Sequence, residues 1–268
     1  MYFRMGITML VQLYTSRVVL NVLGVEDYGI YNVVGSFVVA FAFINGPLTT
    51  AIQRFLNFEI GHSGNDSEVN KIFNLSLYIN LILAFLLLFV VEFAGTWYIE
   101  QKMQLPPGRM EAAKWAFHFS VLGLMINIIK TSYEAVIIAK ENLSFYAFVS
   151  IFEVSFKLLN AFLLLLFSVD KLKLYAVNQF VILVLVFLIL WLYCRKHFVE
   201  VRIKPFKSIW DKKKFNDIIG FSGWSLFGSM ASMSANQGIN LLLNYFFGVL
   251  VNAAMGVATQ VNAAVIQF

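Results

Sequence analysis

Hydrophobic residues run through this chain in long blocks, and polar residues gather in the short stretches between them. A helix needs about 20 mainly apolar residues to cross the hydrocarbon core of a membrane. The sixth block carries no charged residue from Leu174 to Cys194, and no charged residue follows Asp217. The pattern predicts eight membrane-spanning helices, near residues 3–23, 28–53, 72–98, 115–139, 144–168, 174–194, 216–241 and 250–268.

The composition agrees with a membrane protein. Hydrophobic residues make up 60% of the chain and charged residues 13%, and the mean hydropathy is +0.76. A soluble domain of 268 residues needs a far more charged surface than this. The single cysteine, Cys194, excludes a disulfide framework and a multi-cysteine metal site, and no motif calls for a cofactor. We expect an all-α integral membrane protein surrounded by lipid, and a fragment of a longer one, because the last block stops at Phe268 without a flanking anchor.

Basic residues are distributed unevenly between the two sides of the predicted helix bundle. Five lie in loops on the side opposite the N-terminus: Lys102, Arg109, Lys114, Lys171 and Lys173. Twelve lie on the N-terminal side: Arg4, Arg54, Lys71, Lys140 and eight residues between Arg195 and Lys214. Because loops rich in Lys and Arg stay in the cytoplasm, the N-terminus and residues 195–214 are predicted to be cytoplasmic.

The segment "RKHFVEVRIKPFKSIWDKKK" is the one long basic stretch between predicted spans. A basic run can bind nucleic acid, but its place between two spans indicates a linker that sets membrane orientation, so we expect no nucleic-acid partner. Such a linker can also contact anionic lipid headgroups. It divides the chain into a six-helix lobe at 1–194, a cytoplasmic linker at 195–214 and the truncated start of a second lobe at 215–268.

Polar residues inside the spans are costly in lipid and usually face a cavity or another helix. In the seventh span they recur every three or four residues and fall within an arc of about 80° on one helix face. A stripe of this kind is either a packing seam of small residues or the wall of a water-filled space. Its members are Ser222, Ser225, Ser229, Ser232, Asn236 and Asn240.

The fourth and fifth spans each carry a base and an acid four residues apart. Lys130 precedes Glu134, and Glu153 precedes Lys157, so each pair can neutralise itself on its own helix. Ser120, Gly123 and Asn127 share the face of the first pair, and Tyr146, Ser150 and Asn160 that of the second. The pairs either let a helix carry polar groups cheaply or form the wall of a hydrophilic cavity.

Three features of the first two spans and of the break between them complete the candidates. Gly46 and Pro47 lie in the middle of the second span, where proline should kink or break the helix. Asp27 precedes the predicted start of that span, where a carboxylate suits capping. Arg17 lies within the first span, where a lone arginine costs about 3 kcal/mol on insertion scales. Arg17 must therefore meet water, a carbonyl, an anionic ligand or an acid such as Glu26 or Asp27.

The stretches "TSRVVLNVLGVEDYGIYN" and "NGPLTTAIQRFLNFEIG" resemble the opening of polysaccharide-biosynthesis membrane proteins, the Wzx-type flippases for lipid-linked oligosaccharides. That family belongs to the superfamily that also contains multidrug and toxic-compound extruders. The piece "LGVEDYG" is similar to the superfamily's "LG-P-E-x-Y/F-G" turn, with Val25 where proline is usual. The resemblance covers the whole chain, which would end partway into the second half of such a protein.

The resemblance implies a two-lobe bundle of 12 to 14 helices, about eight of them in this chain, in the bacterial inner membrane. It would move an undecaprenyl-pyrophosphate-linked oligosaccharide to the periplasmic leaflet by alternating access, together with a polysaccharide polymerase and other export machinery. Arg17 and Arg54 resemble the family's basic residues that hold pyrophosphate or acidic sugars; Arg54 is otherwise an anchor at a helix end. The remaining candidates follow from helix faces alone: Lys130, Lys157 and Asn236 for substrate, and Glu134, Glu153, Ser229 and Ser232 for the cavity or ion coupling.

Rival functions predict different residues. A cation-coupled drug exporter of the same superfamily needs unpaired acids in its lobe, whereas Glu134 and Glu153 each have an adjacent lysine and Glu92 alone lacks one. A membrane-embedded glycan enzyme needs a large hydrophilic loop or a catalytic constellation. The loop around 99–114 is short, and the three histidines are scattered. A non-transporting scaffold is the remaining alternative, and a transporter rather than an enzyme is the expectation.

Overall fold

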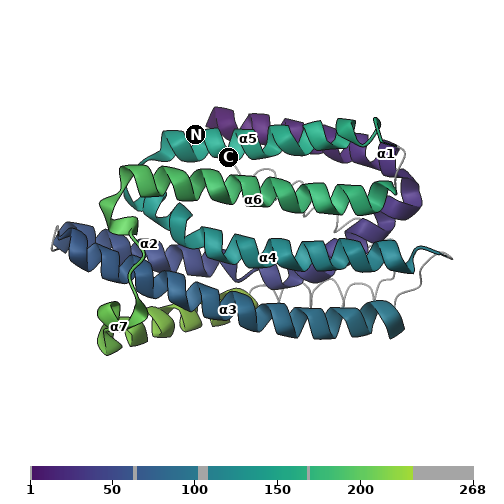
Figure 1. Ribbon diagram of the computed structural model, residues 1–268. Helices are drawn as coiled ribbons and strands as arrows, with labels where there is room; N and C mark the ends of the chain where they lie inside the picture. The colour runs from purple at the N-terminus through teal and green to yellow at the C-terminus, as the bar shows by residue number, and fades with distance from the viewer. Residues whose placement is uncertain (1, 63–64, 102–107, 168–169, 232–268) are drawn as a thin grey trace.

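The computed structural model describes residues 2–62, 65–101, 108–167 and 170–231. Within these ranges the chain is helical, without a β-strand. The helices lie side by side and alternate in direction, so that the start of α1 and the end of α6 lie at the same end of the bundle (Figure 1). The elements are α1 (Tyr2–Ala42), α2 (Asn45–His62), α3 (Asp66–Gln101), α4 (Met110–Ala139), α5 (Leu143–Leu163), α6 (Lys171–His197), a 3-10 turn η1 (Val199–Val201), the short α7 (Phe206–Ile209) and a helical segment at 212–231.

Helix α1 consists of two helices joined at a sharp kink. Gly24 has φ 80° and ψ 169°, a conformation that only glycine adopts without strain. The predicted break between the first two apolar blocks therefore lies at this residue. The second block is interrupted again at residues 43–44, and Pro47 falls in the first turn of α2, where its missing N–H costs little. The predicted interruption near Gly46–Pro47 is confirmed, and it lies just before them.

Five helices in the described part of the chain are long and apolar enough to cross a membrane. They are Gly6–Gly24, Asp66–Gln101, Met110–Ala139, Leu143–Leu163 and Lys171–His197, and they correspond to the first, third, fourth, fifth and sixth predicted spans. The second predicted span is divided between α1 and α2. The seventh is described only as far as residue 231, and the eighth lies outside the described residues.

Helix α4 forms the centre of the bundle, where it contacts α1, α2, α3, α5 and α6. Small residues allow its close approach to α3: a Cβ added at Gly95 would lie 2.0 Å from the Phe117 ring. Such small-residue contacts suit membrane helices, which gain their association energy from close packing. Helix α3 turns large apolar side chains outward, as a lipid-facing helix does: Ile82, Phe85, Leu86, Phe89 and Phe93.

Candidate functional site

Four charged side chains of α4 and α5 form a continuous chain inside the bundle. Lys130 Nζ lies 3.3 Å from Glu134 Oε1 on its own helix and 3.9 Å from Glu153 Oε2 on α5. Glu153 Oε1 in turn accepts a hydrogen bond of 2.6 Å from Lys157 Nζ. The two predicted i, i+4 pairs are therefore confirmed, and the contact between Lys130 and Glu153 joins them. We call these four residues the charge chain.

Lys157 is the most exposed member of the charge chain, and Lys130 is the most buried. The exposed fraction of the side chain is 33% for Lys157, 20% for Glu153, 18% for Glu134 and 11% for Lys130. The chain holds two positive and two negative charges and is neutral as a whole. Because an unpaired charge is very costly in such surroundings, each member depends on its neighbours.

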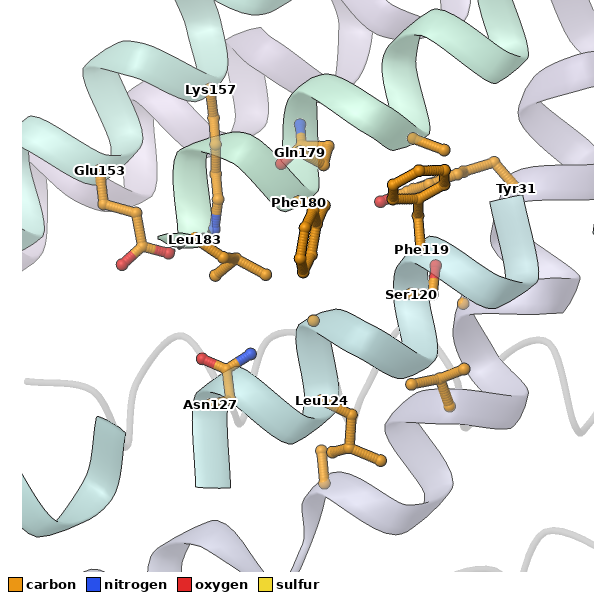
Figure 2. A pocket seen from close by; sticks show the side chains of 15 residues that line it. Tyr31, Phe119, Ser120, Leu124, Asn127, Glu153, Lys157, Gln179, Phe180 and Leu183 are labelled. Atoms are coloured by element: carbon orange, nitrogen blue, oxygen red, sulfur yellow. Dashed lines mark hydrogen bonds and ion pairs between the residues drawn. The ribbon is translucent and has the colours of Figure 1, made fainter. Parts of the chain in front are cut away.

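The exposed end of the charge chain opens into a cavity of about 310 Å³ between α1, α4, α5 and α6. Figure 2 shows Glu153 and Lys157 on one side of the space and Asn127 across from them. Ser120 and Gln179 add further polar groups, whereas the remaining wall is apolar or aromatic and includes Tyr31, Gly35, Phe119, Leu124, Phe180 and Leu183. Ser120, Gly123 and Asn127 thus line one cavity, as their shared helix face predicts. A mostly apolar wall with a small number of polar groups is typical of a ligand-binding cavity.

Amide and hydroxyl groups hold the helices around this cavity together. Asn80 of α3 donates to the hydroxyls of Thr131 and Ser132 on α4, both at 2.9 Å. Asn178 of α6 donates to the side-chain oxygen of Asn160 on α5 at 2.8 Å. Polar side chains that pair between helices stabilise membrane bundles. These pairs could not be predicted from the sequence, because the polar face of one helix does not identify the helix that packs against it.

The two arginines predicted to bind substrate lie on α1 and α2, and neither lines the cavity beside Lys157. Both side chains are exposed, and neither makes an ion pair with a carboxylate among the described residues. The Arg54 guanidinium lies 4.3 Å from the centre of the Phe221 ring, so it contacts the helical segment that follows the linker. Arg17 does not pair with Asp27, whose carboxylate is occupied by another residue.

That residue is Arg109, and the capping prediction for Asp27 is wrong. Asp27 lies inside the helix that resumes after Gly24, and its Oδ2 accepts from Arg109 at 2.8 Å. Arg109 also donates to Asp170 Oδ2 at 2.9 Å, while Asp170 Oδ1 caps α6 by accepting from the backbone of Leu172 and Lys173. The second half of α1 and the segments that precede α4 and α6 are thereby joined at one end of the bundle. All three belong to the same predicted side, which is the signal that could have suggested the cluster.

Glu92 has a partner that sequence spacing did not suggest. Its Oε2 lies 2.8 Å from Nδ1 of His118, across the contact between α3 and α4. Glu92, Glu134 and Glu153 therefore each have a basic partner in the described part of the chain. Among the same residues no group of three or more His, Cys, Asp or Glu side chains is placed to hold a metal ion.

The linker docks against α3 at the end of the bundle that also holds the start of α1 (Figure 1). Asn70 donates to the carbonyls of Glu200 and Arg202 at 2.5 and 2.8 Å, and Asn74 donates to that of Arg202 at 3.0 Å. Tyr78, one turn further on, donates to the Lys204 carbonyl at 3.0 Å. Asn70, Asn74 and Tyr78 follow one another at intervals of four residues, which is visible in the sequence. The sequence does not show that their partner is the backbone of the linker.

Two ion-pair groups strengthen this end. Lys140 lies 2.5 Å from Glu200, and Lys214 lies 3.2 Å from Glu59 and 2.7 Å from Glu68. Burial raises the pKa of Glu200, but the hydrogen bond and positive charge of Lys140, together with further hydrogen bonds to the carboxylate, outweigh burial and hold this pKa below its usual range.

The serine stripe of the seventh predicted span is only partly described. Ser222 is buried, and Ser225 and Ser229 are half-buried, whereas Trp224 and Phe227 on the other face are exposed. Ser232, Asn236 and Asn240 lie outside the described residues. Whether the stripe borders a space between lobes therefore stays a prediction.

No protein-family model and no curated protein sequence matches this chain. Solved structures do match its fold. They include an outward-facing multidrug-resistance MATE family transporter of the MOP superfamily (14% identity, TM-score 0.77, 98% of this chain and 59% of that one). A MOP superfamily transporter from Pyrococcus furiosus, described by a reverse polarity of its binding pocket, matches with 15% identity and a TM-score of 0.77, over 99% of this chain and 59% of that one. A MATE transporter in its bent conformation matches with 16% identity and a TM-score of 0.77, over 98% of this chain and 59% of that one.

These matches show the fold. The chain is an all-helical membrane protein with the fold of MATE transporters, and it spans about 59% of the length of the solved structures that it matches. The division into a first lobe at 1–194, a linker at 195–214 and the start of a second lobe at 215–268 stays a prediction.

Proposed function

We propose that this chain is the first lobe, the linker and the start of the second lobe of a membrane transporter for lipid-linked oligosaccharides. Its cargo would be a polyprenyl-pyrophosphate-linked sugar unit that moves across the bacterial inner membrane by alternating access. The fold supports a transporter, and the resemblance of the opening stretches to oligosaccharide flippases supports the cargo. The polymerase and other export machinery remain proposed partners.

One observation favours an anionic cargo. Glu92, Glu134 and Glu153 have basic partners in the described residues, whereas Arg17 and Arg54 are exposed without a carboxylate partner there. Two guanidinium groups on the first two helices are therefore not neutralised by a described carboxylate. A planar guanidinium stays charged at any cellular pH and can donate two hydrogen bonds to one phosphate group.

The candidate residues divide into three groups on this proposal. Arg17 and Arg54 hold the pyrophosphate. Lys157 contacts an acidic or polar sugar in the cavity, where Asn127 and Gln179 add hydrogen-bonding groups. The buried members of the charge chain, Lys130, Glu134 and Glu153, position Lys157, while Ser229, Ser232 and Asn236 are proposed to border the passage between the lobes.

The test replaces Arg17 in the full-length protein, in a strain whose surface glycan depends on it. Lysine keeps the charge and loses the two-pronged contact, and alanine loses both. A charge-assisted contact of this kind contributes about 1.5–3 kcal/mol, which corresponds to roughly ten- to a hundred-fold in affinity. We expect Arg17→Ala to abolish surface glycan and Arg17→Lys to keep part of it, with both proteins at normal levels in the membrane.

Lys212→Ala provides the matched control, because Lys212 is an exposed basic residue of the linker. It removes one positive charge and should leave the glycan unchanged. Normal glycan in a well-expressed Arg17→Ala strain would remove Arg17 from the transport site. Loss of drug resistance with intact glycan would support the alternative, a cation-coupled multidrug exporter.

A further inference from the structure

A second hollow, separate from the cavity of the charge chain, lies where α6 ends and the linker begins. Its volume is about 330 Å³, and it is lined by Trp191 and Arg195 of α6 and by Val201, Arg202 and Ile203 of the linker. This volume lies at the lower end of the range of small-molecule sites, about 300–1,000 Å³. The hollow shares no lining residue with the cavity around Lys157.

The linker side of this hollow is held in place by α3. The Arg202 carbonyl accepts hydrogen bonds from the side chains of both Asn70 and Asn74. The preceding residue, Val201, is 4% exposed and packs into the hydrophobic core. The backbone at Arg202 is therefore fixed opposite the end of α6, and the hollow is a built feature of the fold.

Two arginines in the hollow lack an acidic partner. The Arg195 guanidinium lies 5.4 Å from the centre of the Trp191 ring, and neither Arg195 nor Arg202 pairs with a carboxylate among the described residues. Lys140 and Lys214, at the same end of the bundle, are by contrast paired with glutamates. Two unpaired guanidinium groups beside one hollow are suited to the oxygens of a phosphate group.

A stripe of exposed apolar side chains on α6 ends next to Arg195. Its side chains are exposed and follow one another at spacings of four, three and four residues, and Arg195 continues the face three residues later. On a membrane-spanning helix such a face lies against acyl chains, and a tryptophan beside it marks the headgroup level. The stripe consists of Val181, Leu185, Leu188 and Leu192.

We propose that the hollow formed by Trp191, Arg195 and Arg202 binds the headgroup phosphate of an anionic phospholipid, with its chains along the α6 stripe. Basic pockets at the membrane surface bind anionic headgroups in this manner. A free phosphate ion would use the arginines and leave the stripe unexplained. The bound lipid would lie between the first lobe and the linker that leads to the second. This site is independent of the cargo proposed above.

The test uses the full-length protein purified in detergent and titrated with phosphatidylglycerol, phosphatidylcholine or inorganic phosphate. Native mass spectrometry counts bound lipid, and thermal unfolding reports stabilisation. We expect saturable binding of phosphatidylglycerol, weakened roughly tenfold or more by the double variant Arg195→Gln/Arg202→Gln. Arg195→Lys/Arg202→Lys, which keeps both charges, should lose less.

The control is Lys207→Gln/Lys213→Gln, which removes two exposed linker charges outside the hollow. Binding should survive in this variant. Equal weakening in the two double variants would overturn the proposal in favour of diffuse attraction between the linker and anionic lipid. Stabilisation by inorganic phosphate that matches phosphatidylglycerol would overturn it in favour of a free anion. Phosphatidylcholine bound as tightly would show that the arginines do not select the headgroup.

Discussion

The charge chain predicts an unequal response to removing its two lysines. Lys130 contacts both Glu134 and Glu153, whereas Lys157 contacts Glu153 alone. Lys130→Met leaves Glu134 without its basic partner in a site where its side chain is 18% exposed. Lys157→Met leaves Glu153 with Lys130, although that contact is longer, at 3.9 Å.

The magnitudes follow from burial. Removing one partner of a buried ion pair costs about 3–5 kcal/mol, because the other charge stays buried and unpaired. Solvent-exposed pairs contribute about 0–1 kcal/mol, and Lys157 is one-third exposed. We therefore expect Lys130→Met to lower the free energy of unfolding by several times as much as Lys157→Met.

Equilibrium unfolding of the full-length protein in mixed detergent micelles measures both losses. The double variant Lys130→Met/Glu134→Gln serves as the control, because it removes the orphaned charge together with its partner. It should recover a large part of the stability lost in Lys130→Met. Equal losses from the two lysine variants, or no recovery in the double variant, would refute the reasoning from burial.

Three further predictions concern the rest of the lobe. Because the pKa of Glu200 is lower in the folded than in the unfolded protein, where it is about 4.5, Glu200 stabilises the fold above pH 4.5, and this stabilisation is lost as the pH falls through the folded pKa. Lys140→Met should therefore reduce the part of the acid-induced loss of stability that Glu200 causes, measured as the free energy of unfolding against pH. Gly95→Ala should destabilise by overlap with the Phe117 ring, and Phe117→Leu should partly rescue it in the same assay. Asn74→Leu should make the linker more sensitive to trypsin, whereas unchanged cleavage would show that this docking is dispensable.

The sequence predicted most of the helices because each apolar block exceeds the thickness of a membrane. It also predicted both i, i+4 ion pairs, since helix geometry alone brings those residues together. The break near Pro47 was predictable because proline lacks an N–H. The precise position, at residues 43–44, depends on packing that no single helix encodes.

The errors and omissions concern contacts between helices. Asp27 has the position of a capping residue, but its partner is Arg109, which is 82 residues away in the chain. Glu92 lacks a lysine on its own helix and instead pairs with His118 of the next one. In each case the residue type indicated a partner, and only the packing of the helices identified it.

The distribution of these contacts bears on how the lobe could move. At one end Arg109 joins α1 to the segment before α6, in the middle Lys130 joins α4 to α5, and at the other end Asn70 and Asn74 hold the linker. Breaking any of these contacts leaves a charged or amide group without its partner, so a rearrangement of the helices within the lobe is costly in free energy. The described start of the next helix is tied to the lobe as well, because Arg54 contacts Phe221 and Lys214 pairs with Glu59 and Glu68. A transporter that works by alternating access would therefore be expected to keep the charge chain intact and to bend beyond these contacts.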